Sequence, residues 1–304
     1  MKGSCLRYFG GYLIALATLL TGKIQKNIEK TLKGELILSI YFHNPTEKMF
    51  VGIIKWLKSK GLHFISADQL VNILESKVEF PKGAVYVSID DGWRDNLNNI
   101  FYTSIGSKIP LTLFPTIEPM IENGGFWWSY IDTGISKGLQ LKKKSLLKIL
   151  KNKERIYEVE KAKKYIKLES ESIDLESLRV LSKKENITIG CHTYSHPILT
   201  TCEDGELDFE IGESREKLTN IINKEIRYFA YTNGIFKKRE KDKVKQFGYR
   251  AGFGTNPELI VKESAINLYD IPRLEISDDM SMMENICRAT GVWYSLNISK
   301  KDNA

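Results

Sequence analysis

The sequence has few cysteines and few histidines, four of each among 304 residues. No two cysteines have the Cys-x-x-Cys spacing, which argues against a zinc ribbon and a disulfide framework and fits a reducing compartment. The cysteines are Cys5, Cys191, Cys202 and Cys287. The histidines are His43, His63, His192 and His196, and three of them belong to the candidate motifs described below.

The chain also lacks a long block of Lys and Arg with interleaved aromatic residues, although its net charge is +7. Without such a block, nucleic acid is not expected as a partner. The positive charge is spread over many lysines, and it favours contact with an anionic membrane surface or an acidic polymer.

The N-terminal segment, residues 1–33, is apolar and then basic. Its apolar stretch at 8–20 is too short to predict a transmembrane helix, and Thr21-Gly22-Lys23 is a poor signal-peptide cleavage site. Lysines follow the stretch at Lys23, Lys26, Lys30 and Lys33. Two interpretations remain, a segment lying on a membrane surface and a plain helix packed on the domain. We therefore expect a cytoplasmic or membrane-associated protein, rather than one exported through an uncleaved N-terminal segment.

Residues 34–304 alternate between strand-like and helix-like stretches, with 42% hydrophobic and 27% charged residues over the chain. Alternation of this kind predicts parallel βαβ units, and about seven strands predict a β/α barrel with its chemistry at the strand C-termini. A lysine-rich stretch at about 118–170 predicts an insertion with solvated helices at 142–151 and 155–168. Single helices are expected at 94–105 and 204–222, and Asp278 or Asp279 is expected to cap the last helix. The expected strands are 35–42, 63–66, 84–91, 110–115, 187–190, 227–231, 249–253 and 271–276.

Two polar motifs follow predicted strands. Asp90 and Asp91 end an apolar run and precede Gly92; one carboxylate would bind a metal while the other acts as acid or base, or the pair forms an ordinary turn. His192 and His196 are four residues apart, a spacing that lets both imidazoles reach one cation. A carboxylate from a distant strand would complete a His/His/Asp site that suits zinc or another divalent transition metal.

These motifs resemble those of a known family. Ser88-Ile89-Asp90-Asp91-Gly92 is similar to the Thr-Phe-Asp-Asp-Gly motif of the polysaccharide deacetylases, the NodB-homology or carbohydrate esterase family 4 group. His192-Thr193-Tyr194-Ser195-His196 is similar to their His-Ser/Thr-x-x-His motif. The resemblance implies a distorted β/α barrel, with Asp90 as catalytic base and with Asp91, His192 and His196 as metal ligands. It also implies that Thr193 bonds within its loop and holds the loop's shape.

The sequence departs from the family at two other motifs. Ala230-Tyr231-Thr232-Asn233-Gly234 stands where the family often has Arg-Pro-Pro-Tyr-Gly, so the arginine that orients the base is missing. No histidine follows His196, so the usual C-terminal general acid is missing too. A permuted branch, which resembles the exported poly-N-acetylglucosamine deacetylases, also lacks that arginine and has its acid in an N-terminal Tyr-His strand end. Tyr41-Phe42-His43 resembles this strand end with one residue inserted, so His43 is the candidate acid; a half-buried strand-end histidine is the alternative.

Four further residues are candidates for supporting roles. Arg273 resembles an arginine in a Pro-Arg strand of this branch, and would either pair with Asp90 and lower its pKa or form a salt bridge at the rim. Trp93, Trp127 and Trp128 would stack on sugar rings, with core packing as an equal alternative for Trp128.

The expected function is metal-dependent removal of an N-acetyl group from an amino sugar of a polysaccharide or glycan precursor. The expected cofactor is a divalent metal, with zinc preferred, and the expected partner is an N-acetylated carbohydrate. Peripheral membrane contact would use residues 1–33. Two alternatives remain: a catalytically impaired carbohydrate-binding protein of the same fold, and a metal amidase that acts on a lipid-linked sugar or peptidoglycan.

Overall fold

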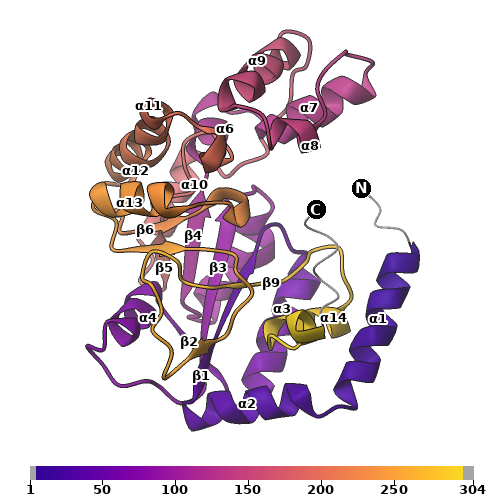
Figure 1. Ribbon diagram of the computed structural model, residues 1–304, viewed down its shortest axis with the longest axis vertical. Coiled ribbons are helices and arrows are strands. Elements are labelled where there is room, and N and C mark those ends of the chain that lie inside the picture. Colours follow the sequence, from indigo (N-terminus) through magenta and orange to yellow (C-terminus); the bar gives the residue numbers. More distant parts are fainter. Residues whose placement is uncertain (1–4, 297–304) are drawn as a thin grey trace. The chain divides into compact units, whose positions relative to one another are not determined.

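The computed structural model describes residues 5–296, which fall into two compact units (Figure 1). Among the described residues, the first unit is made of 5–89, 98–112 and 255–296, and the second of 90–97 and 113–254. Parallel strands alternate with helices along the chain. The predicted α/β fold built mainly on parallel strands is therefore confirmed.

The strand β1 (Leu36–Phe42) is the centre of the first unit, and all seven of its residues are buried. It pairs in parallel with β3 (Ala84–Asp91) and β9 (Leu274–Glu275), and antiparallel with β8 (Ile260–Val261). The short strand β2 (His63–Ile65) pairs in parallel with β3. The nearly unbroken apolar sequences of β1 and β3 are typical of parallel strands covered on both faces.

Local signals in the sequence account for the helix starts in this unit. Thr46 caps α3 (Glu47–Ser59), and Ser66 forms a capping box with Gln69 at α4 (Ala67–Leu74). The prediction that Asp278 or Asp279 caps the last helix is wrong. Ser281 caps α14 by accepting the Glu284 N–H at 3.2 Å, and Asp278 instead accepts the Asn44 N–H at 2.9 Å. No side-chain cap begins α2 (Lys23–Lys33) or α5 (Tyr102–Gly106). The unit also contains α1 (Cys5–Leu19), and α14 spans Met282–Ala289.

The second unit holds four more strands. In chain order they are β4 (Leu111–Pro115), β5 (Ile187–Ile189), β6 (Tyr228–Ala230) and β7 (Ala251–Phe253). β4 lies next to β5, Cys191 bridges in parallel to Phe229 of β6, and β6 pairs in parallel with β7. The residues that follow β5 therefore emerge beside the end of β6.

The insertion between β4 and β5 is more helical than the sequence predicts. It contains α6 (Ile117–Glu122), α7 (Trp127–Ser136), α8 (Lys144–Leu147) and α9 (Asn152–Lys163). The first two helices were not expected, and the helix expected at 142–151 is the single turn α8. α9 has an exposed face, with Lys153 and Glu160 on it, but its other face buries the side chains of Asn152, Arg155 and Glu158. Arg155 bonds to Asn152 and to the segment after β5, as described below. Glu158 accepts the Lys142 N–H at 3.3 Å.

Two of the expected helices contain π-helical turns. The helix expected at 94–105 is the π-helix η1 (Leu97–Phe101) followed by α5. The helix expected at 204–222 consists of α11 (Asp204–Leu207), the π-helix η3 (Asp208–Glu213) and α12 (Ser214–Ile222). The other helical elements are α10 (Leu175–Ser182), α13 (Lys238–Gln246) and the 3-10 turns η2 (Leu199–Thr201), η4 (Thr232–Gly234) and η5 (Trp293–Leu296). None of the helices between residues 5 and 296 is long and apolar enough to cross a bilayer.

Candidate active site

The Asp-Asp-Gly motif leaves β3 in a conformation that L-residues rarely adopt. Asp91 has φ 68° and Gly92 has φ 81°. The Asp91 carbonyl accepts the Thr116 N–H at 3.0 Å, and the Gly92 carbonyl accepts the Ile173 N–H at 2.9 Å. A side chain at Gly92 would also meet Pro115 at 3.1 Å. The turn is therefore held by segments on both sides, and the side chains of Asp90 and Asp91 are both buried.

The loop after β5 is strained in the same way. Thr193 has φ 66° and His196 has φ 57°, each of which costs about 1–2 kcal/mol for a residue with a side chain. The Thr193 hydroxyl accepts the His196 N–H at 2.9 Å, so the loop is closed by its own hydrogen bond. With Asp91, these are three of the eight non-glycine residues with positive φ in residues 5–296. Backbone strain of this kind concentrates at functional sites.

The two strained segments bring three buried side chains together. The Asp91 Oδ1 lies 3.5 Å from the His192 Nε2 and 3.3 Å from the His196 Nε2. One ligand atom from each residue lies within 4.8 Å of those from the other two. Asp91, His192 and His196, which the sequence proposes as ligands, thus offer one carboxylate oxygen and two imidazole nitrogens to a single point.

The protonation of His192 can be derived from its surroundings. Its Nδ1 lies 2.8 Å from the Ala230 carbonyl oxygen. Because a carbonyl only accepts, Nδ1 carries the proton and Nε2 presents a lone pair when the ring is neutral. Burial lowers the pKa of His192 to about 4, against the opposing effect of the Asp90 carboxylate. At neutral pH a nitrogen lone pair therefore faces the Asp91 carboxylate, a repulsive pairing that a cation between them would relieve.

Two tryptophans donate hydrogen bonds to residues of this site. The Trp93 indole N–H donates to the Asp91 Oδ2 at 3.0 Å, which leaves Oδ1 directed at the histidines. The Trp127 indole N–H donates to the His196 carbonyl at 3.0 Å. Trp127 is only 4% exposed, so it offers no ring face to a sugar. Trp128 is half-buried, and its ring lies edge-on to the His196 ring at 4.8 Å.

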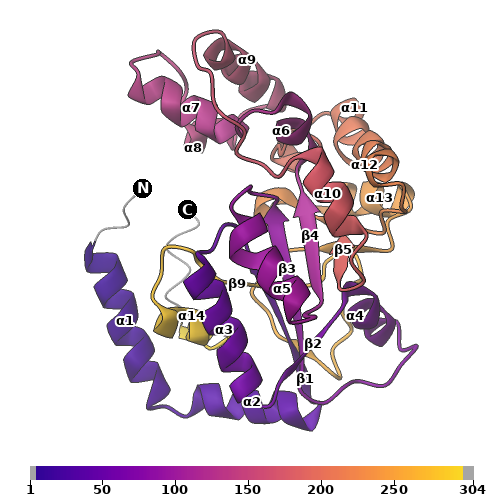
Figure 2. The same ribbon diagram turned by 180° about the vertical axis from the view of Figure 1, so that it is seen from behind.

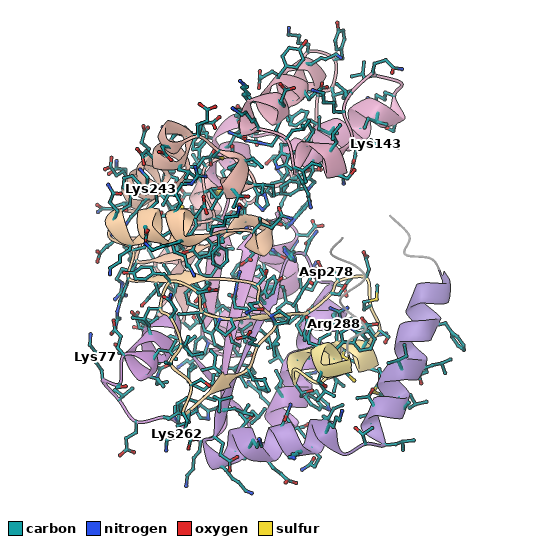
Figure 3. The ribbon with its side chains drawn as sticks, viewed as in Figure 1. Lys77, Lys143, Lys243, Lys262, Asp278 and Arg288 are labelled. Carbon is teal, nitrogen blue, oxygen red and sulfur yellow. The ribbon has the colours of Figure 1, made fainter. Side chains whose placement is uncertain are left out.

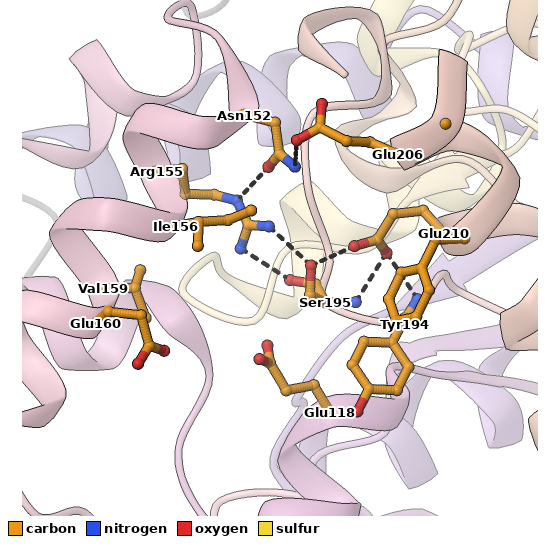
Figure 4. Close-up of a pocket in the computed structure, with 12 residues that line it drawn as sticks. Glu118, Asn152, Arg155, Ile156, Val159, Glu160, Tyr194, Ser195, Glu206 and Glu210 are labelled. Carbon is orange, nitrogen blue, oxygen red and sulfur yellow. Dashed lines mark hydrogen bonds between the residues drawn. The ribbon is translucent and has the colours of Figure 1, made fainter. Parts of the chain in front are cut away.

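A hydrogen-bond network that the sequence does not predict surrounds Ser195, in the middle of the histidine loop (Figure 4). The Glu210 Oε2 accepts the N–H groups of Tyr194 and Ser195, both at 2.9 Å, and its Oε1 accepts the Ser195 hydroxyl at 2.5 Å. From α9, Arg155 donates to the Ser195 carbonyl at 3.2 Å and to its hydroxyl at 2.7 Å. Arg155 also donates to Asn152. Glu210 lies in the π-helix η3, an element that is frequent at functional sites.

The same network lines a cavity of about 360 Å³, with walls from α9, η3 and the loop. Glu118 also lines it, and burial raises the pKa of its carboxyl against the opposing charge of Lys163. None of the three candidate ligands lines this cavity.

The remaining candidates belong to the first unit. His43 is half-buried at the end of β1, with the Tyr41 ring edge-on at 5.3 Å. Arg273 is fully buried; it donates to the Ser88 hydroxyl at 2.9 Å, and its guanidinium lies 4.4 Å from the Tyr41 ring centre. Burial raises the pKa of Asp278, and the charge of His43 opposes this rise, so the two groups interact. The acid role of His43 and the pairing of Arg273 with Asp90 stay predictions.

Comparison with known proteins identifies the family. A family model described as polysaccharide deacetylase matches residues 77–252. The chain belongs to the polysaccharide deacetylase family. It is therefore an enzyme of the class that hydrolyses N-acetyl amides, and the family resemblance predicted from the two motifs is confirmed. No curated protein matches the sequence.

Solved structures share the fold of this deacetylase. The Streptococcus pyogenes deacetylase PplD in complex with acetate is 15% identical, with a TM-score of 0.60, over 84% of this chain and 97% of PplD. A de-N-acetylase from Aggregatibacter actinomycetemcomitans is 17% identical, with a TM-score of 0.57, over 82% and 98% of the two chains. IcaB from Ammonifex degensii is 15% identical, with a TM-score of 0.58, over 84% and 97%.

Proposed function

We propose that the protein is a metal-dependent N-deacetylase that removes acetyl groups from amino sugars of a glycan. Asp91, His192 and His196 would hold a divalent ion, with zinc preferred because two imidazoles and one carboxylate form a donor set that it commonly takes. When bound, the ion supplies Lewis-acid chemistry, polarising the acetyl carbonyl and lowering the pKa of water.

One observation carries the metal assignment. The Nε2 lone pair of neutral His192 faces the Asp91 carboxylate at 3.5 Å. Without a cation, two electron-rich atoms would be buried against each other at this distance, which costs free energy in a medium of low dielectric constant. The Trp93 and Ala230 hydrogen bonds hold both groups in place. Outer contacts of this type are typical of metal sites.

The chain's own residues would then move the protons. Asp90 takes a proton from water as the water oxygen adds to the acetyl carbon. His43, as imidazolium, gives a proton to the amide nitrogen as the carbon–nitrogen bond breaks. The products are acetate and a free amino sugar.

Metal analysis combined with amine release tests this proposal. The purified protein should contain about one zinc per chain and should release primary amines from N-acetylglucosamine oligomers. Asp90→Asn should retain the metal and lose at least about 99% of turnover, because general-base catalysis is commonly worth 10²–10⁴-fold. Asp95→Asn, at an exposed position in the same segment, is the matched control and should behave as wild type.

Full activity of Asp90→Asn would remove Asp90 from the mechanism. Bound zinc without amine release from any N-acetylated oligosaccharide would instead favour the carbohydrate-binding alternative. A chain that binds no divalent metal would contradict the proposal outright.

A further inference from the structure

The helix α1 has an outward face made of large apolar side chains. Residues 8–22 contain no charged side chain, and the exposed large residues recur at the spacing of one helix face. Leu13 is 48% exposed and Leu20 is 89% exposed. The full set is Phe9, Tyr12, Leu13, Leu16, Leu19 and Leu20. Water-exposed helices normally place charged residues on this face.

The opposite face of α1 is made of small residues that pack against α14, beside which it runs in Figures 1 and 2. Gly11 lies so close to α14 that a Cβ there would be 2.2 Å from the Glu284 Oε2. Glu284 is already paired at 2.8 Å with Arg288 of the same helix. Arg288 is labelled on α14 in Figure 3. Ala15 and Thr18 continue this buried face. The helix therefore has the reverse of the usual amphipathic pattern, with small side chains packed against the protein and large apolar side chains exposed to solvent.

Basic residues lie directly beyond the apolar face. Gly22 turns the chain in a left-handed conformation, φ 69°, into α2. There Ile24, Ile28 and Thr31 are buried, whereas Lys23, Lys26 and Lys33 are exposed. An apolar face bordered by lysines matches the acyl chains and the anionic headgroups of a lipid surface. A second copy fits less well, because a symmetric contact through α1 would bring two rows of lysines near each other.

We propose that the outward face of α1, with the lysines at the start of α2, docks the protein on an anionic membrane surface. The 15-residue α1 would lie in the headgroup region rather than span the bilayer. Docking would keep the enzyme close to glycans that are attached to lipids or assembled at the membrane. This inference rests on α1 and α2 alone and does not depend on the proposed function.

Vesicle sedimentation with the full chain tests the docking surface. Wild type should pellet with phosphatidylcholine vesicles that contain phosphatidylglycerol, and should bind pure phosphatidylcholine about tenfold more weakly. Leu13→Glu/Leu16→Glu, and separately Leu20→Glu, should weaken binding to the anionic vesicles at least about tenfold. Ile149→Glu, which replaces an apolar residue that is 75% exposed in the second unit, is the matched control and should bind as wild type.

Lys23→Glu/Lys26→Glu should weaken binding to anionic vesicles about tenfold, and added salt should reduce wild-type binding in the same way. The proposal is overturned if wild type stays in the supernatant with both vesicle types. It is also overturned if sedimentation velocity shows a lipid-free dimer that Leu20→Glu dissociates, because a second copy would then cover the face. Amine release by the soluble variants should match wild type on short oligosaccharides, which separates a failure of docking from a failure of the proposed function.

Discussion

Replacing Glu210 by Ala should weaken metal binding although Glu210 touches none of the three candidate ligands' side chains. Its carboxylate accepts the two N–H groups of Tyr194 and Ser195 and the Ser195 hydroxyl, inside the loop that carries His192 and His196. Without these bonds, the strained loop loses the contacts that hold its positive φ angles. The two imidazoles would then sample positions away from their common point.

The magnitude follows from the bonds lost. Two N–H groups would lose their charged acceptor in a buried setting, at about 1–3 kcal/mol each. Arg155 would also remain buried beside Ser195 with less compensating charge. We expect the free energy of unfolding of the metal-free protein to fall by about 3 kcal/mol. Metal affinity should fall about 10–100-fold, the usual effect of removing outer support from a ligand.

Urea unfolding of the metal-free protein and zinc titration against a chromophoric chelator measure the two effects separately. Glu213→Ala is the control, because Glu213 is exposed on the same π-helix η3, and its stability should change by no more than about 0.5 kcal/mol. Glu210→Gln should lie between the two, since one amide oxygen still accepts both N–H groups. If Glu210→Ala binds zinc as tightly as Glu213→Ala, the loop does not depend on this carboxylate and the reasoning fails.

Three other changes test separate parts of the structure. Trp93→Phe removes the N–H bond to Asp91, so zinc affinity should fall about tenfold in the same titration; an unchanged affinity would show that the indole does not orient the carboxylate. Gly190→Ala places a Cβ 2.4 Å from a phenylalanine ring carbon and should cost about 2–3 kcal/mol in urea unfolding, whereas Gly106→Ala, with open space around it, should cost nothing. Burial raises the pKa of Asp278, so the folded protein holds this proton more tightly than the unfolded chain, and stability falls as pH rises from about 3.9 through the raised value. Asp278→Asn lacks this loss, so its stability relative to wild type should be higher at neutral pH than at pH about 4; a pH-independent difference would contradict the assignment.

Local sequence signals predicted many of the elements. The strands expected at 35–42 and 84–91 depend on apolar runs of neighbouring residues only, and they appear in the structure as β1 and β3. The π-helical turns were not predicted, because an extra residue in a turn is stabilised by packing and not by composition. Asp278 was wrongly predicted to cap the last helix, because its actual partner, the Asn44 N–H, is 234 residues away in the sequence.

The candidate site also has some features that local sequence motifs predict and others that depend on long-range contacts. The sequence alone predicted the family, and it proposed Asp90, Asp91, His192 and His196 as site residues, because their types and spacing are local properties of two short motifs. Tertiary structure decided that Asp91 and the two histidines meet at one point, and that Glu210 and Arg155 hold the loop between them. In the sequence, Glu210 and Arg155 look like ordinary charged residues on the solvent-exposed face of a helix. Whether a charge is solvated or buried depends on a partner brought from a distant segment, and hydrophobic periodicity carries no record of that partner.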